Sequence, residues 1–196
     1  MGEMNNLQER LDLSEAKNRL NNWIAVSVAI ISVFMAITKV KDDNIVQAML
    51  QAKSDAVDTW NEYQSKKVKH HLAEMGLNQV RAIQPLLQGK GNTVLASQQK
   101  GYQDAITRYQ AEEATLSNKA KGFEKQYDDL NYRDDQFDLS DATLSISLAM
   151  LAITALTGKR KLLWMALFFA GFGVLMGLAG LLGLPLHPSA LVKLLS

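Results

Sequence analysis

The hydrophobic residues of this chain fall into three long runs, and a polar section separates the first run from the other two. The runs occupy residues 23–41, 137–157 and 162–184. An α-helix needs about 20 mainly apolar residues to cross the hydrocarbon core of a bilayer. The pattern therefore predicts three transmembrane helices, and Trp23 and Lys39 are suitable interfacial anchors near the ends of the first.

The polar section, residues 42–135, shows a regular helical pattern in its second half. Side chains recur there in alternating steps of four and three, which places them on one seam of a helix, as in a coiled coil. Gln99, Glu113 and Asp134 occupy seam positions and make the seam imperfect. The seam comprises Leu95, Gln99, Tyr102, Ile106, Tyr109, Glu113, Leu116, Ala120, Phe123, Tyr127, Leu130, Asp134 and Phe137.

The first half of the polar section offers a partner for this seam. Residues 84–93 combine one proline, two glycines and an asparagine, which predicts a break between two helical arms, 42–82 and 94–135. Arms of similar length predict an antiparallel hairpin. The expected stripe of the first arm shifts phase near residues 66–69, which predicts a local kink or stutter. It runs through Ile45, Met49, Ala52, Ala56, Trp60 and Tyr63, and then through Val68, Leu72, Met75, Val80, Ile83 and Leu87.

These elements predict an all-α protein, with a long antiparallel helical hairpin inserted between the first and second of three transmembrane helices. Residues 1–22 have apolar positions at roughly helical spacing among many charges, which fits an amphipathic helix at the membrane surface or a solvated helical lead-in. Residues 185–196 begin with a helix-stopping proline and are expected to form an interfacial tail.

The distribution of cations predicts the orientation in the membrane. Lys159, Arg160 and Lys161 lie in the short turn between the last two spans, and cationic loops favour the cytoplasmic side. Cations in residues 1–22 agree, whereas Lys39 and Lys41 on the hairpin side oppose this assignment. The balance predicts a multi-pass protein of a bacterial inner membrane, with a cytoplasmic N-terminus and a periplasmic hairpin.

Composition excludes several classes of function. The formal net charge is +1, and cations and anions are interspersed in the polar section, so no basic surface for nucleic acid is expected. The absence of cysteine excludes disulfides, thiolate catalysis and cysteine-based zinc sites. No phosphate-binding loop, dinucleotide fingerprint or nucleophile elbow occurs, so we expect neither an enzyme nor a cofactor.

The histidines raise the question of a metal site. His70 and Glu74 lie one helical turn apart, and His71 is adjacent, but a metal centre needs three or four ligands. The remaining histidine, His187, is distant in sequence. We therefore expect a solvated helical face and no bound metal, with a metal or ligand sensor as the alternative.

Two features of the later spans have open interpretations. Asp141 fits an interfacial residue at a helix N-terminus, or an intramembrane carboxylate with a role in transport. Gly173, Gly177 and Gly180 predict a face of close helix packing in the third span. The partner of that face can be another span of this chain or a second copy.

The run from Asp58 to Lys69, DTWNEYQSKKVK, resembles a signature of a bacterial membrane-protein family, domain of unknown function 4337. Its pattern is D-x-W-x-x-Y-Q-[AS]-K-x-[IV]-[KR], and the order of apolar spans is also similar. The resemblance implies an integral bacterial membrane protein and brings no activity, substrate or cofactor with it. The residues that match the signature are Asp58, Trp60, Tyr63, Gln64 and Lys66.

Two functions remain as hypotheses at this point. The first is an oligomeric scaffold or interaction module embedded in the lipid bilayer, which associates with its own copies through the hairpin and the third span. The alternative is a channel or transport component with a pore formed by the second and third spans. A protein partner other than a second copy cannot be named from the sequence.

Overall fold

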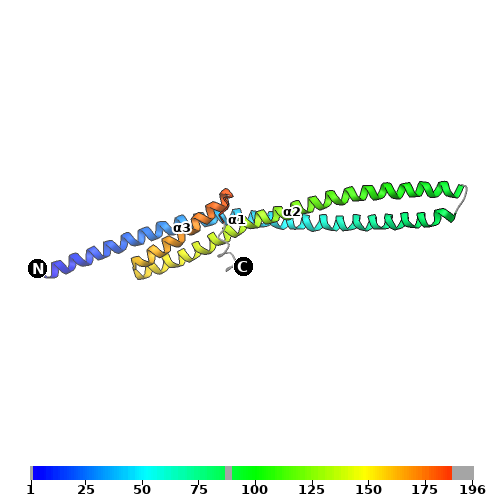
Figure 1. The fold of residues 1–196 in the computed structure, drawn as a ribbon. Coiled ribbons are helices and arrows are strands. Elements are labelled where there is room, and N and C mark those ends of the chain that lie inside the picture. The colour runs from blue at the N-terminus through cyan, green and yellow to red at the C-terminus, as the bar shows by residue number, and fades with distance from the viewer. Residues whose placement is uncertain (1, 87–89, 187–196) are drawn as a thin grey trace. The chain divides into compact units, whose positions relative to one another are not determined.

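The computed structural model describes residues 2–86 and 90–186, and three long helices account for almost all of them (Figure 1). Helix α1 spans Gly2–Ile83, the 3-10 helix η1 spans Gln84–Leu86, α2 spans Lys90–Thr157 and α3 spans Arg160–Leu182. No strand occurs in these described ranges, so the predicted all-α class is confirmed. Neither α1 nor α2 contains proline, and each continues through the expected boundaries between polar and apolar segments.

The chain forms two compact units. The first, called the three-helix unit below, comprises Met1–Gln47 and Leu130–Ser196. Its core consists of aliphatic side chains contributed by all three helices, which pack the N-terminal part of α1 and the C-terminal part of α2 against α3. The fully or largely buried members are Ile24, Ile31, Leu144, Leu151, Ala166 and Ala170.

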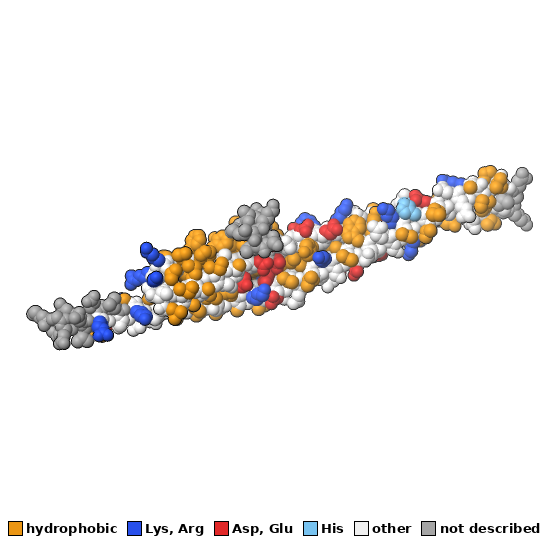
Figure 2. Space-filling model, turned by 90° about the horizontal axis from the view of Figure 1, so that it is seen from below, with side chains coloured by type: hydrophobic (Ala, Val, Ile, Leu, Met, Phe, Trp, Pro, Cys, Tyr) orange, Lys and Arg blue, Asp and Glu red, His pale blue; other side chains and the backbone are white. Residues whose placement is uncertain are grey.

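The three-helix unit places apolar side chains on its surface and several polar side chains inside. Figure 2 shows hydrophobic side chains gathered over this unit. The exposed large hydrophobic residues of the unit include Val26, Ile30 and Phe168. Ser147 and Thr154 of α2 are fully buried, and their hydroxyls donate hydrogen bonds to the carbonyl oxygens of Ala166 (2.8 Å) and Met150 (2.7 Å). Each of α1, α2 and α3 contains a segment long and apolar enough to cross a membrane.

Gly173, Gly177 and Gly180 of α3 lie where neighbouring side chains approach the helix backbone. Because glycine has no Cβ, bulky groups can occupy that space, and this close approach is typical of packed membrane helices. The contacts come from α1 and α2 of the same chain. An added Cβ would lie 2.6 Å from Leu144 Cγ at Gly173, 2.7 Å from Phe34 Cε1 at Gly177, and 2.9 Å from Phe137 Cζ at Gly180.

The C-terminal end of α3 is held by side chains of α2. Gly183 adopts a left-handed conformation (φ 65°) and its N–H bonds to the carbonyl oxygen of Ala179, which ends the helix. The guanidinium of Arg133 donates to the carbonyl oxygen of Gly180 at 2.9 Å, and Gln136 Nε2 donates to that of Leu184 at 2.8 Å. Most of the expected tail, including His187, lies outside the described residues.

The second unit, Ala48–Asp129, is a helical hairpin made of the C-terminal part of α1 and the N-terminal part of α2. Helix α2 already begins at Lys90, so it includes the last residues of the expected break at 84–93. The hydroxyphenyl ring of Tyr102 in the second arm occupies the space beside Gly76 in the first arm, 2.6 Å from the position of a Cβ.

The predicted phase shift in the first arm is wrong. Val68, Leu72 and Met75 are 57%, 60% and 67% exposed, so this part of the shifted stripe faces away from the second arm. Its member Val80 is buried, and Leu87 lies outside the described residues. The original four-three spacing instead continues without interruption beyond Tyr63. It passes through Lys66, His70, Ala73, Leu77 and Val80, of which the last four are buried and Lys66 is partly shielded. Two polar residues in this continuation explain why the apolar pattern suggested a shift.

Candidate functional site

Two signature residues of the first arm, Trp60 and Lys66, form polar contacts with the second arm of the hairpin. Trp60 Nε1 donates a hydrogen bond to Glu124 Oε1 at 2.8 Å. The ring of Tyr63 packs edge-on against that of Trp60, with 5.3 Å between the ring centroids. Lys66 Nζ lies 2.7 Å from Glu112 Oε2. We call this set of contacts the hairpin clasp.

Electrostatics reinforces one part of the hairpin clasp. The hydrogen bond from Lys66 lowers the pKa of the Glu112 carboxyl, and the same bond raises the pKa of Lys66. Both groups therefore stay ionised over a wider pH range. Asp58 and Gln64, the other two signature residues, are exposed and have no hydrogen bond or ion pair to any residue that the structure describes. Of the five signature residues, Trp60 and Lys66 therefore join the two arms, and Tyr63 packs against Trp60 within the first arm.

A buried polar pair lies further along the hairpin. His70 Nδ1 lies 2.9 Å from Glu113 Oε1, and both side chains are largely shielded from solvent. On the exposed side, His71 Nδ1 lies 3.0 Å from Glu74 Oε2, and this contact lowers the pKa of Glu74. Within the described ranges, no group of three or more His, Asp or Glu side chains is arranged to hold a metal ion. His70 Nε2 also lies 3.6 Å from Glu74 Oε1, so Glu74 lies between the two imidazoles.

Acidic side chains of α1 and α2 lie close together in the three-helix unit, just after the C-terminal end of the first apolar run (residues 23–41). Asp42 is only 4% exposed, and its Oδ2 accepts a hydrogen bond from Lys39 Nζ at 2.9 Å. Burial, contact with the Asp42 carboxyl and the charge of Asp138 together raise the pKa of Asp134 to about 7. Sequence reasoning placed Asp134 on the seam but missed this pairing, because Asp42 and Asp134 are far apart in the chain.

Asp141 lies on a face of α2 that no other described residue of the three-helix unit covers. Its side chain is exposed, as are those of Ser145, Ala149 and Ala152, which follow at helical spacing. The opposite face carries the buried Leu144 and the residues that pack on α3. The exposed side of this part of α2 therefore carries small and polar residues next to the exposed apolar side chains of Ile146, Ile153 and Leu156.

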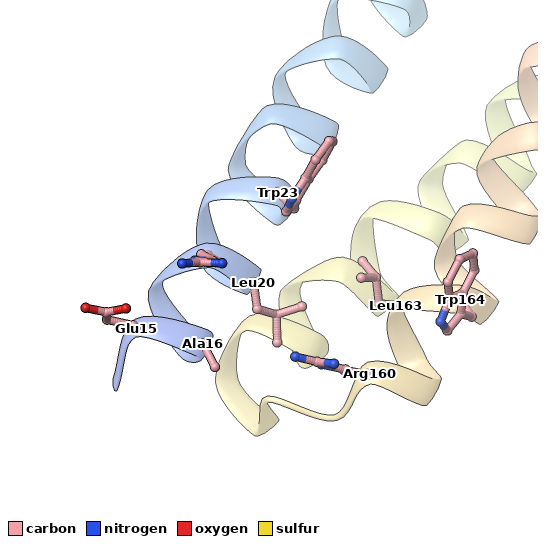
Figure 3. A pocket seen from close by; sticks show the side chains of 8 residues that line it. Glu15, Ala16, Leu20, Trp23, Arg160, Leu163 and Trp164 are labelled. Atoms are coloured by element: carbon pink, nitrogen blue, oxygen red, sulfur yellow. The ribbon is translucent and has the colours of Figure 1, made fainter. Parts of the chain in front are cut away.

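A cavity of about 560 Å³ lies between the N-terminal part of α1 and the start of α3. Figure 3 shows Leu20 and Leu163 reaching into the space between these helices, with Arg160 at one end of it. Trp23 and Trp164 flank the cavity. Sequence reasoning treated the cations on both sides as orientation signals and did not bring them together, since the pairing depends on the packing of α3 against α1.

These features define an all-α protein with three helices that are long and apolar enough for a bilayer, and with a helical hairpin clasped by polar contacts. The sequence profile of the domain of unknown function DUF4337 matches residues 20–183. The chain therefore belongs to this family, as the signature around Trp60 predicted. Comparison with curated proteins and with solved structures gave no match.

Proposed function

We propose that this protein is a membrane-spanning, self-associating scaffold that carries a helical hairpin outside the bilayer. The observation that supports this most strongly is the reversed polarity of the three-helix unit. Valine, isoleucine and phenylalanine side chains cover its surface, while hydroxyl groups are buried and bonded to backbone carbonyls. In water such a surface promotes association, whereas in lipid it is the expected arrangement.

The proposed location is a bacterial inner membrane, with the N-terminus in the cytoplasm and the hairpin in the periplasm. The cations of residues 159–161 support this orientation, because basic loops are retained on the cytoplasmic side. The proposed role is non-enzymatic, since the clasp and the buried pair use their polar groups to bind each other.

The hairpin offers a surface for a second copy of the chain. Val68, Leu72 and Met75 occur at helical spacing on the outer side of the first arm and form an exposed apolar stripe. A two-helix hairpin buries little apolar area, and this stripe lets further copies add to its packing. We call it the outer stripe.

The three-helix unit contributes a second surface to the proposed assembly. The glycine face of α3 is already filled by side chains of α1 and α2, so the outer face of α2 is the better candidate within the bilayer. Small and hydroxyl side chains at positions 145, 149 and 152 allow close helix approach. The channel alternative has less support, because Ser147 and Thr154 direct their hydroxyls to carbonyl groups inside the unit.

Cysteine cross-linking tests this proposal directly, because the chain has no cysteine of its own. A single Leu72→Cys substitution places a thiol on the outer stripe, and Ser97→Cys places one on an exposed position of the second arm as the control. A short bis-maleimide applied to the protein in dilute vesicles is expected to join Leu72→Cys chains and leave Ser97→Cys chains largely single. Equal cross-linking of the two variants, or none in either, contradicts the proposal.

A further inference from the structure

We propose that the cavity between α1 and α3 binds the phosphate group of an anionic glycerophospholipid through Arg19 and Arg160, with the acyl chains lying beside Trp23 and Trp164. The inference rests on the proposed membrane location. It adds a ligand to the protein, and it concerns the end of the three-helix unit where the chain turns from α2 into α3.

The first support is the pair of guanidinium groups. Arg19 of α1 and Arg160 of α3 both line the cavity, although they are far apart in the chain. Neither has a hydrogen bond or ion pair to any side chain in the described part of the chain. Guanidinium groups bind phosphate oxygens in bidentate geometry, so two of them facing one cavity form a suitable anion receptor.

The second support is the apolar wall of the same cavity. Leu20 and Leu163 line its inner side, and Trp23 and Trp164 are 70% and 72% exposed. Exposed tryptophan is enriched at the level of the lipid headgroups, where the ring contacts acyl chains and the indole N–H remains near polar groups. A free phosphate ion would use the arginines and leave this wall uncovered, whereas a phospholipid would occupy both.

The third support is the local charge. Lys17, Lys159 and Lys161 lie close in sequence to the two arginines, and basic sites between membrane helices on the cytoplasmic side are known to bind anionic headgroups. The single carboxylate among the lining residues is Glu15, which Figure 3 shows pointing away from the space between the helices. The net charge of the lining side chains is therefore positive and suits one anionic group.

Fluorescence quenching by brominated lipids tests the site. The full chain, with Trp60→Phe so that Trp23 and Trp164 are the remaining tryptophans, is reconstituted in phosphatidylcholine vesicles that contain increasing fractions of brominated phosphatidylglycerol. The variant Arg19→Gln/Arg160→Gln removes the receptor. Lys17→Gln/Lys159→Gln removes the same charge from residues that do not line the cavity and serves as the matched control.

We expect brominated phosphatidylglycerol to quench the tryptophans at a much lower mole fraction than brominated phosphatidylcholine. The arginine variant should weaken this preference by about tenfold or more, and the lysine control by less than about threefold. Equal weakening in both variants, or in neither, overturns the site. Addition of inorganic phosphate at millimolar concentration distinguishes the ligand: displacement of the lipid would show a site for free phosphate and would contradict a lipid site.

The same experiment separates this inference from the membrane proposal. If both brominated lipids quench the tryptophans equally, the helices lie in the bilayer and only the selective lipid site is wrong. If neither lipid quenches them, the membrane location itself is contradicted.

Discussion

His70 Nδ1 and Glu113 Oε1 lie 2.9 Å apart on facing arms of the hairpin, and both residues occupy positions where the seam would otherwise be apolar. Each side chain provides the polar partner that the other needs, because burying an imidazole or a carboxylate without a partner costs free energy. The pair fixes the register of the two arms, because sliding one arm by a helical turn would leave both groups unpaired.

The first prediction concerns this pair. Glu113→Ala should destabilise the hairpin by about 1–3 kcal/mol, because His70 would lose its partner in a shielded position. Glu113→Gln retains a hydrogen-bonding group and should cost less. Hydrogen exchange of the two arms in the full chain measures the effect locally. The double variant His70→Leu/Glu113→Leu should restore protection, and faster exchange in it than in Glu113→Ala would contradict this account.

The second prediction concerns pH. Since the pKa of Asp134 is raised to about 7, the folded protein binds more protons than the unfolded chain between the ordinary carboxyl range and pH 7. Stability should therefore be highest at the acidic end and fall as pH rises through this window. We expect the melting temperature in detergent to drop by about 2–4 °C from pH 5 to pH 8 because of this group.

Asp134→Asn should remove most of this dependence and raise the melting temperature at pH 8, because a neutral amide then faces Asp42. Asp128→Asn, an exposed position in the hairpin, serves as the control and should leave the slope unchanged. A wild-type protein that becomes more stable as pH rises would contradict the assignment.

The third prediction uses two glycines of α3 that differ only in their surroundings. Gly173→Ala should destabilise the three-helix unit by about 1–3 kcal/mol, because the new methyl would meet Leu144 Cγ and Thr143 Oγ1 within 2.7 Å. No atom lies within 4 Å of a Cβ at Gly171, so Gly171→Ala should be neutral or stabilising by up to about 1 kcal/mol. Thermal unfolding midpoints of the two variants in detergent, followed by circular dichroism, compare them directly, and equal midpoints would contradict this packing.

The fourth prediction concerns the outer stripe. Leu72→Glu/Met75→Glu should weaken self-association by about tenfold or more, because two exposed apolar side chains are replaced by like charges that would meet in the contact. Gln98→Glu/Gln110→Glu adds the same charge to exposed positions of the second arm and should have little effect. Single-molecule photobleaching counts in vesicles give the subunit number of each variant.

The sequence predicted the helices and the seam of the second arm, because both depend on local periodicity. Residues from Leu95 to Phe137 at four-three spacing are shielded as expected, with Tyr102 at the margin of exposure. The seam of the first arm was not predicted correctly, because Lys66 and His70 occupy seam positions although lysine and histidine are more common on protein surfaces. Their place in the seam becomes clear only from the structure, in which Lys66 pairs with Glu112 and His70 pairs with Glu113.

The periodicity of the sequence could not predict which distant segments of the chain contact one another. The spacing of Gly173 and Gly177 indicated a packing face but could not distinguish α1 and α2 from a second copy. In the same way, the cations near residues 19 and 160 indicated an orientation, and only the packing of α3 beside α1 revealed a shared cavity. The glycine face and the cavity are therefore results of tertiary structure.

The most direct test of the proposed scaffold is the mass of the protein extracted in native lipid particles. The chain has a mass of 21.7 kDa. We predict protein masses at a defined multiple of this value, and a shift to smaller assemblies when the outer stripe carries Leu72→Glu/Met75→Glu. A single species containing one chain, in the wild type and at every concentration measured, would contradict a self-associating scaffold.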